Sequence, residues 1–509
     1  MHRKALLIFA VALHTTAAVG AGASGTQCEN LTGLTIPDVR ITAASVVGPG
    51  SFPASTPPVQ VTVPKLCRVV AVASPTPQSH INLEVWIPAE EQWNGKLLGT
   101  ANGGFAGSIP YAAMAAGALR GYATVGTDTG HSADQMEFGR NSPEKIVDWA
   151  YRSVHIMTTT AKLVVRNHRG RFPQRSYFNG CSTGGQQALS EVQRFPEDYD
   201  GIVAGAPGNN RKRLIYGFLW SWQALHTDDG KPRLTSGHLR MITRHARAAC
   251  DRIDGLQDGL IDDPRHCDFD PGALLCKGDA TDSCLTGEQI AAVRAVYRGA
   301  SRAKSGEQIF VGWPRGSEEG WQRYLLAPPE PMRLGLFRDF GFHDPHWDWR
   351  SFDWDRDIDY LDAQLPHLDA TSRDLRAFQG RGGKIIMYAG GADAVVPAQD
   401  TIDYFEAVAS EMGGLATVQD FFRLFLVPGM GHCGGEVSLD TFAALTALER
   451  WVERGHRPQG LLAEQRREGQ VVRTRPLCAY PEIARYTGVG SSDDAGNFRC
   501  VTAPATTSD

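Results

Sequence analysis

The stretch that decides the fold is Ser176-Tyr177-Phe178-Asn179-Gly180-Cys181-Ser182-Thr183-Gly184-Gly185. Residues 176–179 are a short β-prone run, and residues 185–194 have a helical pattern. A sharp strand-to-helix turn between them would expose the hydroxyl of Ser182, because flanking glycines let the backbone pass without Cβ clashes. The helix would also direct N–H groups and its positive dipole end at this hydroxyl. The stretch therefore predicts a nucleophilic serine, and the alternative is an ordinary glycine-rich turn.

Length and composition narrow the class of protein. A chain of 509 residues indicates two structural units, or one domain with a large insertion. A hydrophobic content of 42% and a charged content of 21% are typical of globular proteins. The formal net charge of −5, with no basic face, argues against a nucleic-acid partner. No apolar run is long enough to span a membrane, so we expect no membrane partner.

The N-terminus has the features of an export signal. A basic start, His2-Arg3-Lys4, precedes the apolar residues 5–13 and the small residues Ala21-Gly22-Ala23. This order predicts a signal peptide over residues 1–23 and a secreted or periplasmic protein.

Ten cysteines in an exported chain are expected to be paired, although their number does not fix the connectivity. Near-neighbour pairing would join Cys28 to Cys67, Cys250 to Cys267, Cys276 to Cys284 and Cys478 to Cys500. Cys181 and Cys433 would then remain for each other.

Strands and helices alternate on both sides of the serine turn. Buried strand patterns lie at residues 96–100, 122–128, 201–205, 384–388 and 421–427. This alternation predicts an α/β fold with a mainly parallel sheet.

The pattern is interrupted by a long insertion. Seven of the eleven tryptophans lie between residues 210 and 379, where the strand alternation is lost and Pro, Gly and Asp become more frequent. We expect a lid domain at 210–379, inserted into a catalytic domain formed by residues 24–209 and 380–509. Most of its aromatic side chains are expected to form a core, and a few to line a pocket for a flat substrate.

Two residues after the insertion complete a catalytic pattern. Asp393 follows the strand pattern at 384–388, and His432 lies in a glycine-rich loop after the strand pattern at 421–427. The order Ser182, Asp393, His432 is the order of the triad in the α/β-hydrolase fold. We therefore predict this fold, with His432 as general base and Asp393 as the acid that orients it.

Backbone N–H groups near the serine are candidates for an oxyanion hole. In this fold one donor follows the nucleophile, here Thr183, and the other comes from an earlier glycine-rich loop. The sequence Ala101-Asn102-Gly103-Gly104 fits that loop, and we select Ala101 and Gly103. A simple flexible turn is the alternative.

An acidic loop inside the insertion suits a hard cation. Asp251, Asp254 and Asp258 are spaced by three and four residues, and glycines between them permit a tight wrap. Carbonyl groups of Leu256 and Leu260 could add ligands. We expect a structural metal here, and a solvated acidic turn is the alternative.

Two other catalytic hypotheses, an aspartic protease and a cysteine nucleophile, fit the sequence less well. An aspartic protease needs two Asp-Thr-Gly or Asp-Ser-Gly loops, and the chain has only Asp128-Thr129-Gly130. Cys181 could itself be the nucleophile, but an exported cysteine with an available partner is expected to be oxidised. If Ser182 and His432 lie within hydrogen-bond reach, a disulfide between Cys181 and Cys433 is geometrically plausible.

Taken together, these motifs resemble the tannase and feruloyl esterase family, which includes the hydrolase of mono(2-hydroxyethyl) terephthalate. The resemblance covers nearly all of the mature chain and adds Trp93-Asn94-Gly95-Lys96 and Asn102-Gly103-Gly104-Phe105-Ala106-Gly107 to the motifs above. It implies a calcium ion held by the lid and a disulfide between Cys181 and Cys433. The calcium ligands that it implies are Asp251, Asp254, Leu256, Asp258 and Leu260. Ala101 stands where the family often has glycine, but its N–H is retained.

The resemblance implies a serine esterase that acts on small esters of aromatic acids, such as hydroxycinnamic or gallic esters attached to plant polysaccharide or polyphenol. One alternative is hydrolysis of a terephthalate half-ester, whose free carboxylate would need an arginine. Candidate arginines in the insertion are Arg315, Arg323, Arg333 and Arg338. Another alternative is a non-catalytic protein that binds phenolic compounds.

Overall fold

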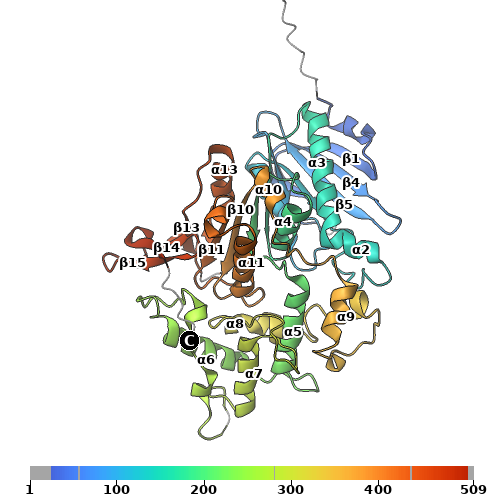
Figure 1. The fold of residues 1–509 in the computed structure, drawn as a ribbon. Coiled ribbons are helices and arrows are strands. Elements are labelled where there is room, and N and C mark those ends of the chain that lie inside the picture. The colour runs from blue at the N-terminus through green and yellow to red at the C-terminus, as the bar shows by residue number, and fades with distance from the viewer. Residues whose placement is uncertain (1–24, 56–57, 280, 436–437, 503–509) are drawn as a thin grey trace, which may run out of the picture.

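The computed structural model describes residues 25–55, 58–279, 281–435 and 438–502, and the predicted signal peptide lies outside these residues. A nine-stranded sheet forms the centre of the molecule (Figure 1). Its order is β1 (Val39–Val47), β4 (Leu66–Ala73), β5 (Ile81–Pro88), β7 (Ala123–Thr127), β6 (Lys96–Thr100), β8 (Arg175–Cys181), β9 (Gly201–Gly205), β10 (Lys384–Gly390) and β11 (Phe422–Val427).

The sheet is parallel from β7 to β11 and antiparallel at its N-terminal end, where β1, β4 and β5 pair. Alternate residues face opposite sides, as strand geometry requires. Leu97 and Phe178 belong to the core on one side, and their neighbours Leu98 and Tyr177 belong to the core on the other. Both faces of the parallel strands are therefore buried, which explains why these strands are almost continuously apolar.

Helices cover both faces of the sheet. The first face packs against α3 (Ser153–Arg169), α4 (Thr183–Arg194) and α11 (Ala398–Glu411), and the second against α13 (Ala444–Arg454). Smaller elements complete this part: α1 (Tyr111–Leu119), α2 (Pro143–Val147), α10 (Arg376–Gly380), α12 (Leu415–Gln419), β2 (Gly50–Pro53), β3 (Gln60–Val63), β12 (Thr441–Phe442), β13 (Gly460–Arg467), β14 (Gln470–Cys478), β15 (Glu482–Tyr486) and β16 (Phe498–Thr502).

The helical segment over residues 143–169 is not one regular helix. A π-helical turn, Asp148–Arg152, separates α2 from α3. The carboxylate of Asp148 is fully buried, and its Oδ1 accepts a bond of 2.6 Å from Nε of Arg152. Such a turn inserts a residue into the helix and re-aims the side chains around it, and sequence periodicity does not show this local change.

The insertion lies between β9 and β10, and its described residues contribute no strand to the large sheet. It contains α5 (Arg211–Leu225), α6 (Ser236–Cys250), α7 (Gly287–Arg298), α8 (Glu318–Trp321) and α9 (Asp357–Gln364), which lie together below the sheet in Figure 1. Trp222, Trp313 and Trp321 are buried in its core. This core also includes Phe105 and Trp149 from the sheet region, so it is continuous with the loops at one end of the sheet.

The ten cysteines form five disulfides, and none of the described helices is long and apolar enough to cross a membrane. The pairs are Cys28–Cys67, Cys181–Cys433, Cys250–Cys267, Cys276–Cys284 and Cys478–Cys500.

Candidate active site

Ser182 occupies a sharp turn between β8 and α4. Its backbone has φ of 63° and ψ of −120°, a conformation that costs a non-glycine residue about 1–3 kcal/mol. The turn is held by a bond of 2.9 Å from its N–H to the carbonyl of Gly205 on β9. A Cβ atom at Gly184 would lie only 2.5 Å from the Cβ of Ala101, so the close approach of the two loops requires glycine there. The serine is therefore raised at the carboxyl end of the sheet.

The structure brings the predicted acid and base to this serine. His432 Nε2 lies 2.8 Å from Ser182 Oγ, and His432 Nδ1 lies 2.9 Å from Asp393 Oδ2. The three residues follow β8, β10 and β11, whose parallel arrangement places all three loops at one edge of the sheet. The arrangement can transfer a proton from the serine hydroxyl to the imidazole.

Asp393 is rigidly held. Its side chain is fully buried, and its Oδ1 accepts bonds from the N–H groups of Val395 (2.7 Å) and Val396 (2.9 Å). Trp313 of the insertion donates a bond of 2.8 Å to the carbonyl of Ala394 in the same loop. The acid is thus fixed by its own backbone and by the insertion, and its carboxylate lies where it can accept a hydrogen bond from Nδ1 of His432 while Nε2 faces the serine.

The disulfide Cys181–Cys433 links the residue before the serine to the residue after the histidine. Its Cα atoms lie 6.0 Å apart, although 252 positions separate the two cysteines in sequence. Because Cys181 is oxidised, it has no thiolate to act as a nucleophile. This arrangement argues against Cys181 as the reacting group.

The glycine-rich loop after β6 contacts the turn that carries Ser182. The hydroxyl of Thr183 donates to the carbonyl of Gly104. The N–H of Asn102 donates to Gln187 Oε1 at 3.1 Å, so this donor is already used. Gly103 has open space on one side, since a Cβ atom there would meet none of the described atoms within 4 Å. The geometry leaves Ala101, Gly103 and Gly104 as candidates for the second donor, beside Thr183.

Two arginines lie next to this loop. Arg211, at the start of α5, donates to Gln186 Oε1 at 3.0 Å and lies over the ring of Trp149. Arg333 stacks over Phe105, with its guanidinium carbon 4.5 Å from the ring centroid. Burial, and secondly the charge of Arg333, lowers the pKa of Arg211 to about 9, and burial lowers the pKa of Arg333 to about 10.

The sequence named Arg333 among four candidates but missed Arg211. The sequence signal for Arg211 was its position shortly after the strand pattern at 201–205. A residue that follows a parallel strand lies at the carboxyl edge of the sheet, where the site forms. Of the other three candidates, Arg338 pairs with Glu330 and Arg315 donates to the carbonyl of Phe269. Arg323 is exposed and stacks on Tyr324, whose ring centroid lies 6.3 Å from that of His432.

The predicted cation loop is tightly folded. Asp251 Oδ1 accepts from the N–H groups of Asp258 and Gly259, and Asp254 Oδ1 accepts from the N–H of Leu256. Asp258 also contacts the buried Arg475 of β14, which the sequence did not connect with this loop. The loop is separate from the triad but packs against the segment that leads to His432. A Cβ atom at Gly429 in that segment would meet the Leu260 side chain at 2.7 Å.

The loop fits a hard cation by its donor set. A fourth carboxylate, Asp262, lies beside the loop, and its Oδ1 is buried without a hydrogen-bond partner among the described residues. Burial, and secondly the charge of Asp254, raises the pKa of Asp262 to about 8. Arg475 offsets only part of this crowding of negative charge, so the oxygen-rich site is electrostatically suited to a dication.

Comparisons with known proteins show which family this chain resembles. A family model described as "Tannase and feruloyl esterase" matches residues 67–328 and 334–501. An uncharacterised esterase of Xanthomonas campestris is 36% identical, with 97% of this chain and 95% of that protein aligned. The mono(2-hydroxyethyl) terephthalate hydrolase of Piscinibacter sakaiensis is 33% identical, over 83% of this chain and 82% of that protein.

The crystal structure of feruloyl esterase B from Aspergillus oryzae superposes with a TM-score of 0.87 at 29% identity, covering 93% of this chain and 99% of that one. The prediction of an α/β-hydrolase fold with a large insertion is therefore confirmed.

Proposed function

Since the chain belongs to the tannase and feruloyl esterase family and is a carboxylic ester hydrolase, we propose that it hydrolyses esters of aromatic acids through a Ser182–His432–Asp393 triad. The observation that carries this proposal is the separation of 2.8 Å between His432 Nε2 and Ser182 Oγ, with the buried Asp393 behind the imidazole. An ester whose acyl group is ferulate or gallate is the first substrate class to test.

The reaction follows from the geometry. His432 takes the proton of Ser182 as the hydroxyl attacks the ester carbonyl, and Asp393 stabilises the imidazolium that forms. The N–H groups of Thr183 and of Ala101 or Gly103 hold the oxyanion. The imidazolium then gives its proton to the departing alkoxide. His432 next activates a water molecule, which hydrolyses the acyl-enzyme and frees the serine.

A substrate panel tests the proposal. Methyl ferulate, methyl gallate and mono(2-hydroxyethyl) terephthalate differ in ring substituents and charge. A preference for one of them by about 100-fold in kcat/KM, which is about 2.7 kcal/mol in transition-state free energy, identifies the acyl group. We expect turnover of at least one. A folded, calcium-loaded protein that hydrolyses none of the three would favour the alternative of a non-catalytic phenolic-binding protein.

One observation favours the half-ester as a second candidate. Arg333 forms no ion pair within the described part of the chain, and Arg211 lies close enough for the two charges to interact. Two neighbouring guanidinium groups next to the glycine-rich loop suit a substrate that carries a free carboxylate. Mono(2-hydroxyethyl) terephthalate has such a group, whereas methyl ferulate is neutral.

Arg333→Gln is expected to lower kcat/KM for mono(2-hydroxyethyl) terephthalate by about 10–100-fold, the contribution of a charged hydrogen bond, with little change for methyl ferulate. Arg338→Gln is the matched control, because Arg338 already pairs with Glu330 at 3.0 Å. Equal losses on both substrates in Arg333→Gln would contradict a role in binding the carboxylate.

The finer organisation of the chain is also proposed here. Residues 24–209 and 380–509 would form the catalytic domain, residues 210–379 a lid, and residues 1–23 a signal peptide. Five disulfides support export to an oxidising compartment, either the periplasm or the medium.

Calcium is proposed as a structural ion of the lid loop, held by Asp251, Asp254 and Asp258 with the carbonyls of Leu256 and Leu260. A calcium concentration near 100 times Kd is expected to stabilise the folded protein by about 3 kcal/mol relative to the calcium-free protein. A chelator should remove this contribution and lower Tm. Asp254→Asn should abolish the calcium dependence of Tm. The exposed Asp268→Asn is the control, and a Tm unaffected by chelation in the wild type would rule the ion out.

A further inference from the structure

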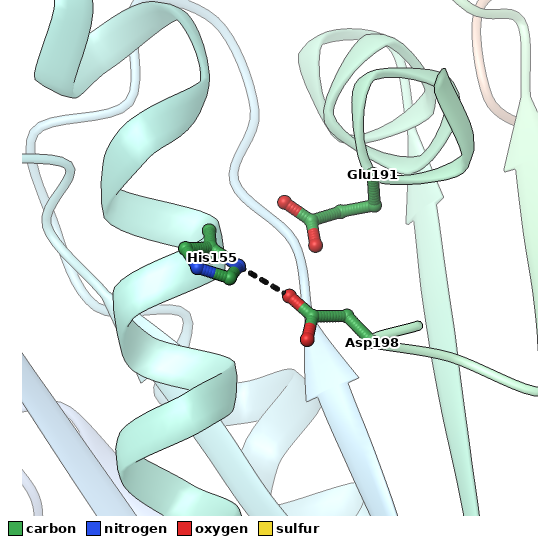
Figure 2. A group of neighbouring side chains, drawn as sticks. All are labelled: His155, Glu191 and Asp198. Carbon is green, nitrogen blue, oxygen red and sulfur yellow. Dashed lines mark hydrogen bonds and ion pairs between the residues drawn. The ribbon is translucent and has the colours of Figure 1, made fainter. Parts of the chain in front are cut away.

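A second cluster of ligating side chains lies away from the catalytic serine. It consists of His155 on α3, Glu191 on α4 and Asp198 in the loop between α4 and β9. One ligand atom from each of the three lies within 4.8 Å of the other two. Figure 2 shows the three side chains pointing toward one another from these separate elements. The cluster thus joins three parts of the chain at one point.

Glu191 is the unusual member. Its side chain is 1% exposed, and neither carboxylate oxygen meets a hydrogen-bond donor within the described ranges. Its carboxylate is directed at His155 and Asp198 (Figure 2). Leaving a buried carboxylate without a partner is costly. Something that this chain does not supply, either a cation or a proton, must satisfy it.

The other two members contact each other directly, and a bound ion would take the place of this contact. His155 Nδ1 lies 2.6 Å from Asp198 Oδ2, and the ring stacks on Phe195 with centroids 3.8 Å apart. The His155 side chain is 29% exposed, so an ion can reach the cluster from solvent. The only cation beside it is Lys162, whose Nζ lies 3.5 Å from Asp198 Oδ1 among the residues described. This long contact does not reach either oxygen of Glu191.

We propose that His155, Glu191 and Asp198 bind a divalent transition-metal ion, for which zinc is the probe. One imidazole nitrogen and two carboxylates, with water in the fourth position, are a suitable ligand set for zinc. Glu191 is near the C-terminal end of α4, the helix that begins after Ser182. The ion therefore links α4 to α3 and to the loop before β9. Its effect is on stability and not on chemistry.

The experiment uses the full mature chain without a histidine tag, with calcium present in excess. Isothermal titration with zinc chloride is expected to show one bound equivalent, retained after dialysis and measured by elemental mass spectrometry, and zinc is expected to raise Tm. Glu191→Gln and His155→Gln should each weaken zinc binding by at least about 100-fold and abolish the rise in Tm.

Glu197→Gln is the matched control. Glu197 is exposed and lies in the same loop, so this substitution removes the same charge without removing a ligand of the cluster. It should bind zinc as the wild type does. His155→Gln keeps the test valid if Glu191→Gln fails to fold, because His155 is partly exposed. Absence of zinc binding in the wild type, or equal binding in the wild type and Glu191→Gln, would overturn the proposal. In the first case a proton shared by Glu191 and Asp198 satisfies the carboxyl pair.

Discussion

Replacing Ser182 by alanine is expected to lower kcat for aromatic esters by at least about 10⁴-fold. The hydroxyl is the group that His432 deprotonates across 2.8 Å, and no covalent acyl-enzyme can form without it. Alanine tolerates the positive φ of 63° no worse than serine does, so the fold should be unchanged. Initial rates and circular dichroism of the purified variant measure the two effects.

Ser190→Ala is the control for this variant, because Ser190 is a buried serine on the helix that follows Ser182 and is not part of the triad. It should keep nearly wild-type turnover. Residual activity within about tenfold of the wild type in Ser182→Ala, after exclusion of contaminating esterase, would contradict the triad.

Removing the Cys181–Cys433 disulfide is expected to have the largest effect on stability. This bond closes a loop of 252 positions, and the chain-entropy treatment assigns about 5 kcal/mol to such a constraint. The double variant Cys181→Ala/Cys433→Ala should therefore show a lower denaturation midpoint. It should also show a lower kcat, because the bond holds the loops of Ser182 and His432 together and small displacements weaken proton transfer.

The disulfide Cys276–Cys284 provides the comparison. It spans only 8 positions within the insertion, so its double alanine variant should lose roughly half as much stability and keep its kcat. Equal losses of activity in the two double variants would show that the bond beside the site has no special positioning role. Full activity of Cys181→Ala/Cys433→Ala would also exclude a thiol nucleophile.

Much of this site follows from local sequence. The run from Ser176 to Gly185 encodes the turn, because a strand pattern, flanking glycines and a helix pattern occur in the required order. Asp393 and His432 could be assigned because each follows an apolar strand pattern at a position that the parallel topology brings to one edge of the sheet.

Features that depend on packing between distant segments could not be predicted. The N–H of Asn102 is occupied by Gln187, a contact between segments 85 positions apart. Arg333 and Arg211 come from different parts of the insertion and approach each other only in the folded chain. Arg475 reaches the acidic loop from a C-terminal strand. Side-chain type and periodicity carry no information about such partners, because tertiary contacts determine them.

The cluster formed by His155, Glu191 and Asp198 was missed for the same reason. Glu191 and Asp198 are separated by 7 positions, and β8 and most of α4 lie between His155 and Glu191. This spacing is not typical of a metal-binding motif. A buried acid within the helix after the serine was the available signal.

Labelling with a reactive aryl phosphonate tests the central claim most directly, because such a reagent phosphonylates an activated nucleophile much faster than an ordinary side chain. We expect one equivalent to bind, activity to fall in proportion, and peptide mass mapping to place the adduct on Ser182 with the Cys181–Cys433 disulfide intact. An adduct on another residue, or full activity after stoichiometric labelling, would contradict the assignment of Ser182 as the nucleophile.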